Sequence, residues 1–152
     1  MSNRTIAAPD PSSAPASPCT CFRLRKLSRL LSQRYDAALA PAGINVNQFS
    51  ILRRAARTPQ AIGALALELG MDRTTLTRDL KHLVDAGWIR FATGEDARRK
   101  QVVVTAAGNR TVEQARPLWQ AVQDETGMIV GDTALEKLHA VLDRATRRLE
   151  AR

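Results

Sequence analysis

The sequence lacks the long apolar segments that membrane and secreted proteins require. No apolar run approaches the ~18 residues of a membrane-spanning helix, and the first 18 residues lack the hydrophobic core of a signal peptide. We therefore expect a cytoplasmic protein. Its 152 residues, 44% hydrophobic and 25% charged, are typical of one globular domain.

Cysteine and histidine are scarce, with two of each. Cys19 and Cys21 lie one residue apart, so they cannot build the disulfide framework of a small secreted protein. His82 and His139 are not a pair at metal-ligand spacing, and we expect both to be exposed on helices. Phosphate-loop and nucleophile-elbow motifs are also missing, and a thiol oxidoreductase normally has two residues between its cysteines. We therefore expect neither an enzyme nor a bound cofactor.

Positive charge, in contrast, is abundant. The chain has 23 Lys and Arg against 15 Asp and Glu, which gives a formal net charge of +8 and a pI near 10.7. A small domain with this charge binds either a polyanion or a membrane surface, and the balance favours nucleic acid.

The first 18 residues form a segment rich in Pro, Ser and Ala that holds four of the seven prolines. Such a composition cannot bury enough apolar surface to order itself. We expect residues 1–18 to be a disordered tail and residues 19–152 to form a single domain.

Helical periodicity follows the tail. Apolar residues recur at helical spacing from Phe22 to Ala38, until Pro41 and Gly43 stop the helix. A second helix follows an asparagine cap and ends before Pro59. Its expected inward residues are Phe49, Leu52 and Ala56.

Residues 61–87 predict two short helices joined by a tight turn. Gly70 suits the left-handed conformation after the first helix, and Asp72 suits the N-cap of the second. Two β-type runs follow at 88–92 and 101–104, and the charged segment between them predicts a hairpin with a basic tip.

Two further helices are expected toward the C-terminus. Thr105 caps a long helix that we expect to be kinked at Pro117 and broken at Gly131. Thr133 and Glu136 have the spacing of a capping box for the last helix. Apolar residues then recur at alternating three- and four-residue spacing, a seam that requires a partner helix from this chain or from a second copy. The seam residues are Leu135, Leu138, Leu142, Ala145 and Leu149.

The helix expected over residues 72–86 has two contrasting faces. The inward face is expected to carry Leu76, Leu80, Leu83 and Val84. The outer face carries Arg73, Thr74, Thr77, Arg78, Lys81 and His82. Arginine and lysine reach guanine edges or phosphates, and threonine contacts phosphate or a thymine methyl group. Taken by itself, such a face can equally be a solvated surface.

The neighbouring elements favour DNA binding. A short helix, a glycine turn, a second helix and a basic hairpin make a helix-turn-helix with a wing, in which the second helix enters the major groove and the wing the adjacent minor groove. Arg98, Arg99 and Lys100 at the wing tip suit the negative potential of a narrow minor groove.

Two stretches carry a family resemblance: LALELGMDRTTLTRDLKHLVDAGWI and, after it, GEDARRKQVVVTAAG. Their most specific elements are the LGMDRTTLTR run, the Asp-x-Arg at Asp96 and Arg98, and the strand that ends in Thr105 before an Ala-Gly helix start. In these elements the chain resembles the MarR family of bacterial transcriptional regulators, from Phe22 to the C-terminus. It departs from the family pattern at Gly63, where the first motif helix should begin, so the start of that helix and a small strand near Ile62 stay open.

The resemblance implies a mainly α fold with a small β-hairpin: a winged helix-turn-helix at 46–104 and dimerisation helices at 20–40 and 105–152. It also implies an obligate homodimer on a pseudo-palindromic operator, with Arg98 in the minor groove and Asp96 orienting it. The major-groove contacts that it implies are Arg73, Thr74, Thr75, Thr77, Arg78 and Lys81.

Family members often bind small phenolic or aromatic acids between the dimerisation helices and the winged helix. A carboxylate ligand needs an arginine beside an apolar wall. Phe49 and Trp119 are equally suited to the core, so a ligand pocket is only one interpretation. Its candidate residues are Arg25, Tyr35, Phe49, Arg53 and Trp119.

Cys19 and Cys21 are candidates for a thiol sensor or a soft-metal site. Cys21 is expected in the first turn of a helix, where the dipole and the nearby basic residues favour a thiolate. A direct disulfide would close a small strained ring, so we expect oxidation to give a sulfenic acid or a bond between chains. Two thiols suit arsenic or mercury, whereas zinc needs four ligands, which two chains could supply. Alternatively, Cys21 is simply a buried residue at the start of the helix.

Together these patterns predict a dimeric repressor that a small ligand, or thiol or soft-metal chemistry, releases from its operator. The alternative is an architectural protein that uses the same charge to coat double-stranded DNA with little sequence preference.

Overall fold

The computed structural model describes residues 17–93 and 100–151, and the chain divides into two compact units, residues 1–31 and 32–152. Most of the predicted tail therefore lies outside the described residues. So do Asp96, Arg98 and Arg99 of the predicted wing tip. Within the described ranges, no helix combines the length and the apolar character needed to cross a membrane.

The described part of the first unit is the start of α1 (Thr20–Leu39) and the residues just before it. The Ser17 carbonyl accepts a hydrogen bond from Nε of Arg23 at 2.5 Å, so the segment before the helix folds back on its first turn. Phe22 and Leu24 of the predicted apolar stripe are exposed.

In the second unit, the end of α1 leads through a short 3₁₀ turn, η2 (Ala40–Ala42), into α2 (Val46–Ala55). The predicted asparagine cap is confirmed: Asn45 and Gln48 each accept from the backbone N–H of the other, at 2.9 and 3.0 Å. The inward position of Ala56 was wrong. Because the helix ends at Ala55, Ala56 is the exposed C-cap and Ala55 is buried instead.

The predicted helix pair is α3 (Ile62–Leu69) and α4 (Arg73–Asp85). Gly70 ends α3 with φ +62°, the left-handed conformation that glycine adopts without a steric penalty. The start of α3, which the sequence left open, follows directly on a short strand, β1 (Gln60–Ala61), at an alanine that cannot cap it.

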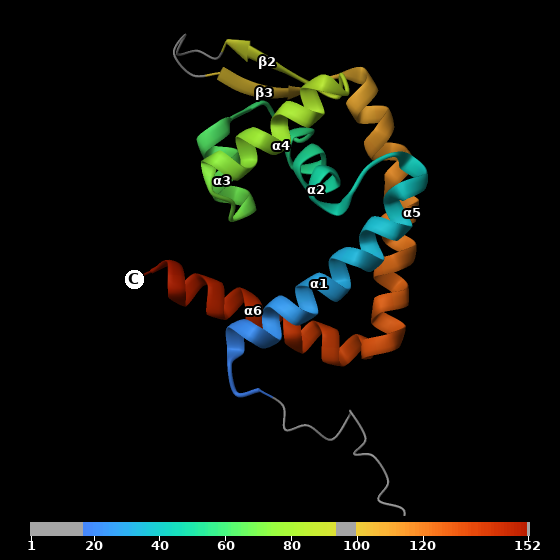
Figure 1. The fold of residues 1–152 in the computed structure, drawn as a ribbon, viewed down its shortest axis with the longest axis vertical. Helices are drawn as coiled ribbons and strands as arrows, with labels where there is room; N and C mark the ends of the chain where they lie inside the picture. The colour runs from blue at the N-terminus through green and yellow to red at the C-terminus, as the bar shows by residue number, and fades with distance from the viewer. Residues whose placement is uncertain (1–16, 94–99, 152) are drawn as a thin grey trace, which may run out of the picture. The chain divides into compact units, whose positions relative to one another are not determined.

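The wing consists of β2 (Ile89–Thr93) and β3 (Lys100–Val104), an antiparallel pair in the register Phe91 opposite Val102. Within the described residues β1 adds to the far edge of β3, so the sheet order is β1-β3-β2 and the hairpin becomes part of a three-stranded sheet. Figure 1 shows the hairpin beside α4.

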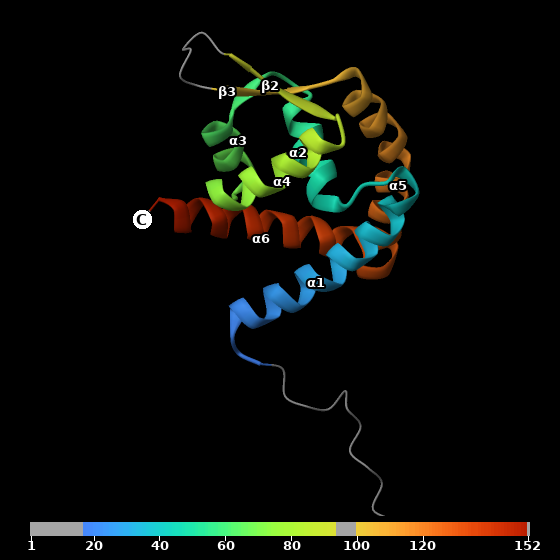
Figure 2. The same ribbon diagram turned by 45° about the horizontal axis from the view of Figure 1, so that its top comes forward.

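The C-terminal part is α5 (Ala106–Val130) and α6 (Asp132–Glu150), which meet at a corner (Figure 2). Thr105 caps α5 as predicted, since its hydroxyl accepts from the Gly108 N–H at 3.1 Å, and Pro117 lies within the helix. The capping box at Thr133 was wrong. The break is a single residue, Gly131 with φ +89°, so Thr133 already lies inside the first turn of α6 and the cap position has no side chain.

One hydrophobic core joins the winged helix to α5. The leucines of α4 pack with residues of α2, α3, the sheet and the first half of α5. The seam of α6 behaves differently: Leu135, Leu138 and Leu142 are half-buried, and Ala145 and Leu149 are exposed. The largest fully buried side chains of the hydrophobic core are Leu39, Phe49, Ile51, Leu52, Leu65, Leu76, Leu80, Leu83 and Val102.

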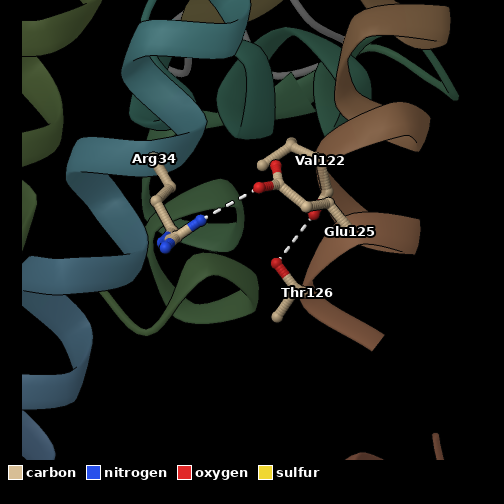
Figure 3. Close-up of polar contacts among 4 residues, drawn as sticks. All are labelled: Arg34, Val122, Glu125 and Thr126. Atoms are coloured by element: carbon tan, nitrogen blue, oxygen red, sulfur yellow. Dashed lines mark hydrogen bonds and ion pairs between the residues drawn. The ribbon is translucent and has the colours of Figure 1, made fainter. Parts of the chain in front are cut away.

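Polar contacts fasten the end of α1 to α5. Arg34 pairs with Glu125 at 3.1 Å, and next to Glu125 the Thr126 hydroxyl donates to the Val122 carbonyl of the same helix, α5, at 2.7 Å (Figure 3). Tyr35 donates to Oε1 of Gln123 at 2.5 Å, and its partial burial raises the pKa of the phenol. Because both charges of the Arg34 pair are about half exposed, the pair contributes at most about 1 kcal/mol.

The first turn of α5 packs tightly on the residue before the wing. A Cβ at Gly108 would lie 2.1 Å from the Trp88 carbonyl oxygen, and the Thr105 hydroxyl donates to the Gly87 carbonyl at 2.7 Å. Glycine at 108 is therefore required by a backbone-to-backbone contact between α5 and the start of β2.

We expect Gly108→Ala to lower the free energy of unfolding by about 1–3 kcal/mol, because α5 must move away from Trp88. Gly63→Ala is the matched control, since a Cβ there meets nothing within 4 Å and alanine favours the helix by up to about 1 kcal/mol. Urea unfolding of both variants measures the difference. Equal midpoints would show that the contact does not constrain the fold.

Candidate nucleic-acid interface

The exposed face of α4 is held in place by its cap and its buried leucines. Oδ1 of Asp72 accepts from the Thr75 N–H at 2.8 Å, and Oδ2 accepts from the Thr75 hydroxyl at 2.5 Å. These bonds stabilise the carboxylate and hold the pKa of Asp72 below its usual value. Because the inward leucines are fully buried, the helix cannot rotate about its axis, and the opposite face stays exposed.

A hollow of about 750 Å³ lies between this face of α4 and strand β2. One side is basic and hydroxyl-bearing, and it comes from successive turns of the helix. On the other side, the described lining is the aromatic ring of Phe91 from the strand. The lining residues are Arg73, Thr74, Thr77, Arg78, Lys81, Val84 and Phe91.

The cations of this hollow are available to an anionic partner. Among the described residues, the guanidinium groups of Arg73 and Arg78 have no hydrogen-bond or ion-pair partner. Lys81 pairs with Asp85 at 3.1 Å, but both side chains are largely exposed, so a phosphate can replace the carboxylate at little cost. The positive end of the α4 dipole lies at Arg73 and adds to the same field.

Five of the six predicted major-groove residues line the hollow, and Thr75 does not. Its hydroxyl donates to Asp72 and its side chain is half-buried, so it acts here as part of the helix cap. The Thr77 hydroxyl donates to the Arg73 carbonyl at 2.7 Å, which leaves its methyl group and an acceptor lone pair for other contacts.

Two apolar members of the hollow were not identified from the sequence. Val84 was wrongly assigned to the inward face: Leu83 fills the core position, and Val84, one step around the helix, is 37% exposed. Phe91 is 39% exposed although it shares a strand face with buried Ile89. Alternation along β2 would place both residues on one face, but only the tertiary structure shows that the core covers Val102 of the central strand and leaves Phe91, opposite it on the edge strand, exposed.

Only Lys100 of the three predicted wing-tip cations is described. Its Nζ lies 5.9 Å from the centroid of the Phe91 ring, within the range of a cation–π contact. Arg98, Arg99 and the orienting Asp96 lie outside the described residues, and their roles stay predictions.

The predicted ligand pocket is brought together in part. Phe49 and Trp119 lie with ring centroids 6.1 Å apart, and Cζ of Arg53 lies 4.7 Å above the Trp119 ring. They border a hollow of about 580 Å³ between α2, α3 and α5, beside the ion pair of Arg54 and Glu68 at 2.7 Å. Phe49 is only 2% exposed and is mainly a core residue.

The remaining two pocket candidates are not among the described lining residues of this hollow. Tyr35 is bonded to Gln123. Arg25 belongs to the first unit, where it lies exposed on α1.

Cys19 and Cys21 are exposed, free thiols at the start of α1. The Cys19 carbonyl accepts from the Arg23 N–H at 3.2 Å, which makes Cys19 the residue before the helix and puts Cys21 in its first turn, as predicted. Burial of Cys21 is not observed in the single chain. Across the described ranges, no three His, Cys, Asp or Glu side chains cluster closely enough to hold a metal ion.

Comparisons with known proteins agree with this geometry. A model described as MarR family matches residues 42–99. YwoH, an HTH-type transcriptional regulator of Bacillus subtilis (strain 168), is 30% identical over 94 residues, 60% of this chain and 68% of that protein. The M. tuberculosis transcriptional regulator MosR in complex with DNA is 37% identical, with a TM-score of 0.76 over 86% of this chain and 98% of MosR. A variant of E. coli MarR with operator DNA is 25% identical, with a TM-score of 0.74 over 82% and 91%.

The Asp72 cap makes the stability of α4 sensitive to acid. Because the folded pKa is lowered, the cap stabilises the protein above the unfolded value of about 3.8 and loses this contribution as the pH falls through the lower folded pKa. We expect Asp72→Asn, whose amide oxygen still accepts from the Thr75 N–H but whose amide nitrogen cannot accept from the Thr75 hydroxyl, to have a lower Tm near pH 7 and to lose part of the acid-dependent fall in Tm. Thermal unfolding between pH 2 and 7 measures this; superimposable Tm profiles would contradict the role of the carboxylate.

Proposed function

Since this chain belongs to the MarR family of transcriptional regulators, we propose that it is a homodimeric repressor that binds a pseudo-palindromic operator in double-stranded DNA. The observation that carries the proposal is the basic hollow of α4, where the guanidinium groups of Arg73 and Arg78 have no partner among the described residues. A regulator of this kind acts on the chromosome, so we place it in the cytoplasm.

The chemistry of the hollow suits a DNA duplex. Arginine pairs in bidentate fashion with guanine in the major groove, and threonine methyl groups contact the thymine methyl. Arg73 and Arg78 lie five residues apart along α4 with Thr74 and Thr77 between them, so one helix face carries both kinds of contact. MosR and E. coli MarR, both similar to this chain, have structures with DNA, which supports the same partner here.

The uncovered apolar surface of the C-terminal helices supports a homodimer. Ile129 and Val130 at the end of α5, and Val141 and Leu149 of α6, are all exposed in the single chain. Such a surface requires a partner, and a second copy supplies a matching one. A dimer also reads two half-sites about one helical turn apart, because one winged helix supplies only part of a specific interface.

The alternative is an architectural protein that coats DNA with the same charge. The uniform basic charge fits both interpretations, but the hydroxyl-bearing, capped helix favours base recognition. The two functions differ in their response to competitor DNA.

We expect a discrete gel shift of a duplex from the gene's own upstream region that survives excess nonspecific DNA. Arg78→Ala should weaken this binding by about 10- to 100-fold and reduce the preference over nonspecific DNA, because a base contact is lost. Arg116→Ala, which removes an exposed charge from α5, is the matched control and should change affinity only slightly. Loss of the discrete shift under competition would favour the architectural function.

Control of binding is proposed to act through thiol or soft-metal chemistry at Cys19 and Cys21, or through a small ligand at the Arg53 hollow. Both thiols are exposed and therefore accessible to an oxidant or a soft metal, and Cys21 lies in the first turn of α1. The Arg53 guanidinium beside an aromatic wall suits a small aromatic acid, although Arg53 already stacks on Trp119.

The cysteines are tested by titrating operator binding after treatment with diamide, zinc or arsenite. Diamide is reduced to the hydrazine as two thiols join, so it reports a bond between chains. We expect weaker operator binding of the wild type and no response of the Cys19→Ser, Cys21→Ser double variant. Unchanged wild-type affinity with every probe would assign the cysteines a purely structural role.

A further inference from the structure

We propose that Phe91 and Val84 form an apolar seat for a deoxyribose of the operator, and that Lys100, held over the Phe91 ring, binds the adjoining phosphate. This contact would position the recognition helix without reading sequence. The inference rests on the proposed function, since it requires α4 in the major groove.

The strand geometry explains why Phe91 is exposed. Ile89 and Phe91 point to the same face of the hairpin, opposite Val104 and Val102 respectively. Val102, opposite Phe91 on the central strand β3, is fully buried, whereas Phe91 on the edge strand β2 is 39% exposed, so at this register the core covers β3 but not β2. An aromatic side chain here loses hydrophobic stabilisation in the free protein, which indicates a partner that covers it.

The surroundings of the ring identify the chemistry of that partner. The apolar pair is bordered by Arg78 and Lys81 of α4 and by Lys100 of β3. A partner that fits must therefore present an apolar surface flanked by negative charges. A sugar–phosphate strand does so at every nucleotide, since each deoxyribose lies between two phosphates.

The position of the seat agrees with how a winged helix meets a duplex. When the recognition helix enters the major groove and the wing enters the adjacent minor groove, the strand that separates these grooves crosses the junction between helix and wing. In this chain that junction is the hollow between α4 and β2, which Val84 and Phe91 both line. The backbone, rather than a base, is the part of DNA that reaches it.

Lys100 is ordered by the same ring. It lies opposite Thr93 in the register, on the strand face that carries Phe91, and its ammonium group is 5.9 Å from the ring centroid. A flexible lysine that is held in advance loses less entropy when it binds a phosphate. Phe91 is thus a positioning residue for Lys100 as well as a contact to the sugar.

The test uses the full-length protein and fluorescence anisotropy on two duplexes, the upstream region and a scrambled sequence. We expect Phe91→Ala to weaken binding about tenfold on both, because every sequence has the same sugar. The slope of log K against log salt should stay unchanged in Phe91→Ala and fall by about one in Lys100→Met, which removes a phosphate contact. Leu67→Ala, which truncates an 82% exposed residue of α3 outside the hollow, is the matched control and should bind like the wild type.

A third duplex, the upstream region with every thymine replaced by uracil, distinguishes a sugar contact from a base contact. For a sugar contact, the ratio of wild-type to Phe91→Ala affinity is the same with thymine and with uracil. A ratio that falls to about one in the uracil duplex would assign Phe91 to a thymine methyl group and overturn the proposal. Wild-type affinity of Phe91→Ala would overturn it as well.

Two further measurements keep the outcomes distinct. Dimer dissociation of Phe91→Ala in size-exclusion chromatography would make the ring part of a contact between copies and contradict the proposal. If Phe91→Ala fails to fold, Phe91→Leu and Val84→Ala replace it, with about threefold losses expected on both duplexes.

If the wild type itself gives no competitor-resistant shift, the proposed function fails. If Arg78→Ala behaves as expected while Phe91→Ala does not, only this inference fails.

Discussion

Burial of the leucine face of α4 is the interaction on which the candidate site depends. Leu76, Leu80 and Leu83 are fully buried, and each contributes about 1.5–3 kcal/mol relative to exposure. This packing fixes the rotation of the helix about its axis, and the Asp72 cap fixes where the helix begins. The guanidinium groups of Arg73 and Arg78 then project outward because no other orientation keeps the leucines out of water.

The contact between the first turn of α5 and the residues before β2 connects the long helix α5 to the wing. The first turn of α5 lies against the Trp88 backbone, where Gly108 permits the approach, and Thr105 bonds to the Gly87 carbonyl. At the other end, α5 is bonded to α1 through Tyr35 and Arg34. A displacement of the helices proposed to form the dimer would therefore reach the wing through one continuous helix, which is the coupling that a ligand-responsive repressor requires.

Much of this arrangement could be predicted from local chemistry. Gly70, Asp72 and Thr105 mark helix ends through conformational freedom or a side-chain bond to the backbone, and these effects act within a few residues. Errors arose where neighbours decided the outcome. Thr133 has the spacing of a cap, but the break between α5 and α6 is too short for it, and Val84 has helical spacing with the leucines although the core ends at Leu83.

The sequence by itself determined the class of fold, the position of the recognition helix and the sign of its charge, because periodicity, caps and composition are local properties of the chain. The tertiary structure decided which of those residues share one surface. Whereas Thr75 is kept out of the hollow by a local bond to Asp72, three residues before it, the tertiary structure added Phe91 of β2 to the basic face of α4. It also brought Lys100 over that ring, a contact set by strand register. The contacts of Phe91 join separate elements, α4 with β2 and β2 with β3, and they exist only once the helix and the wing have packed on a common core.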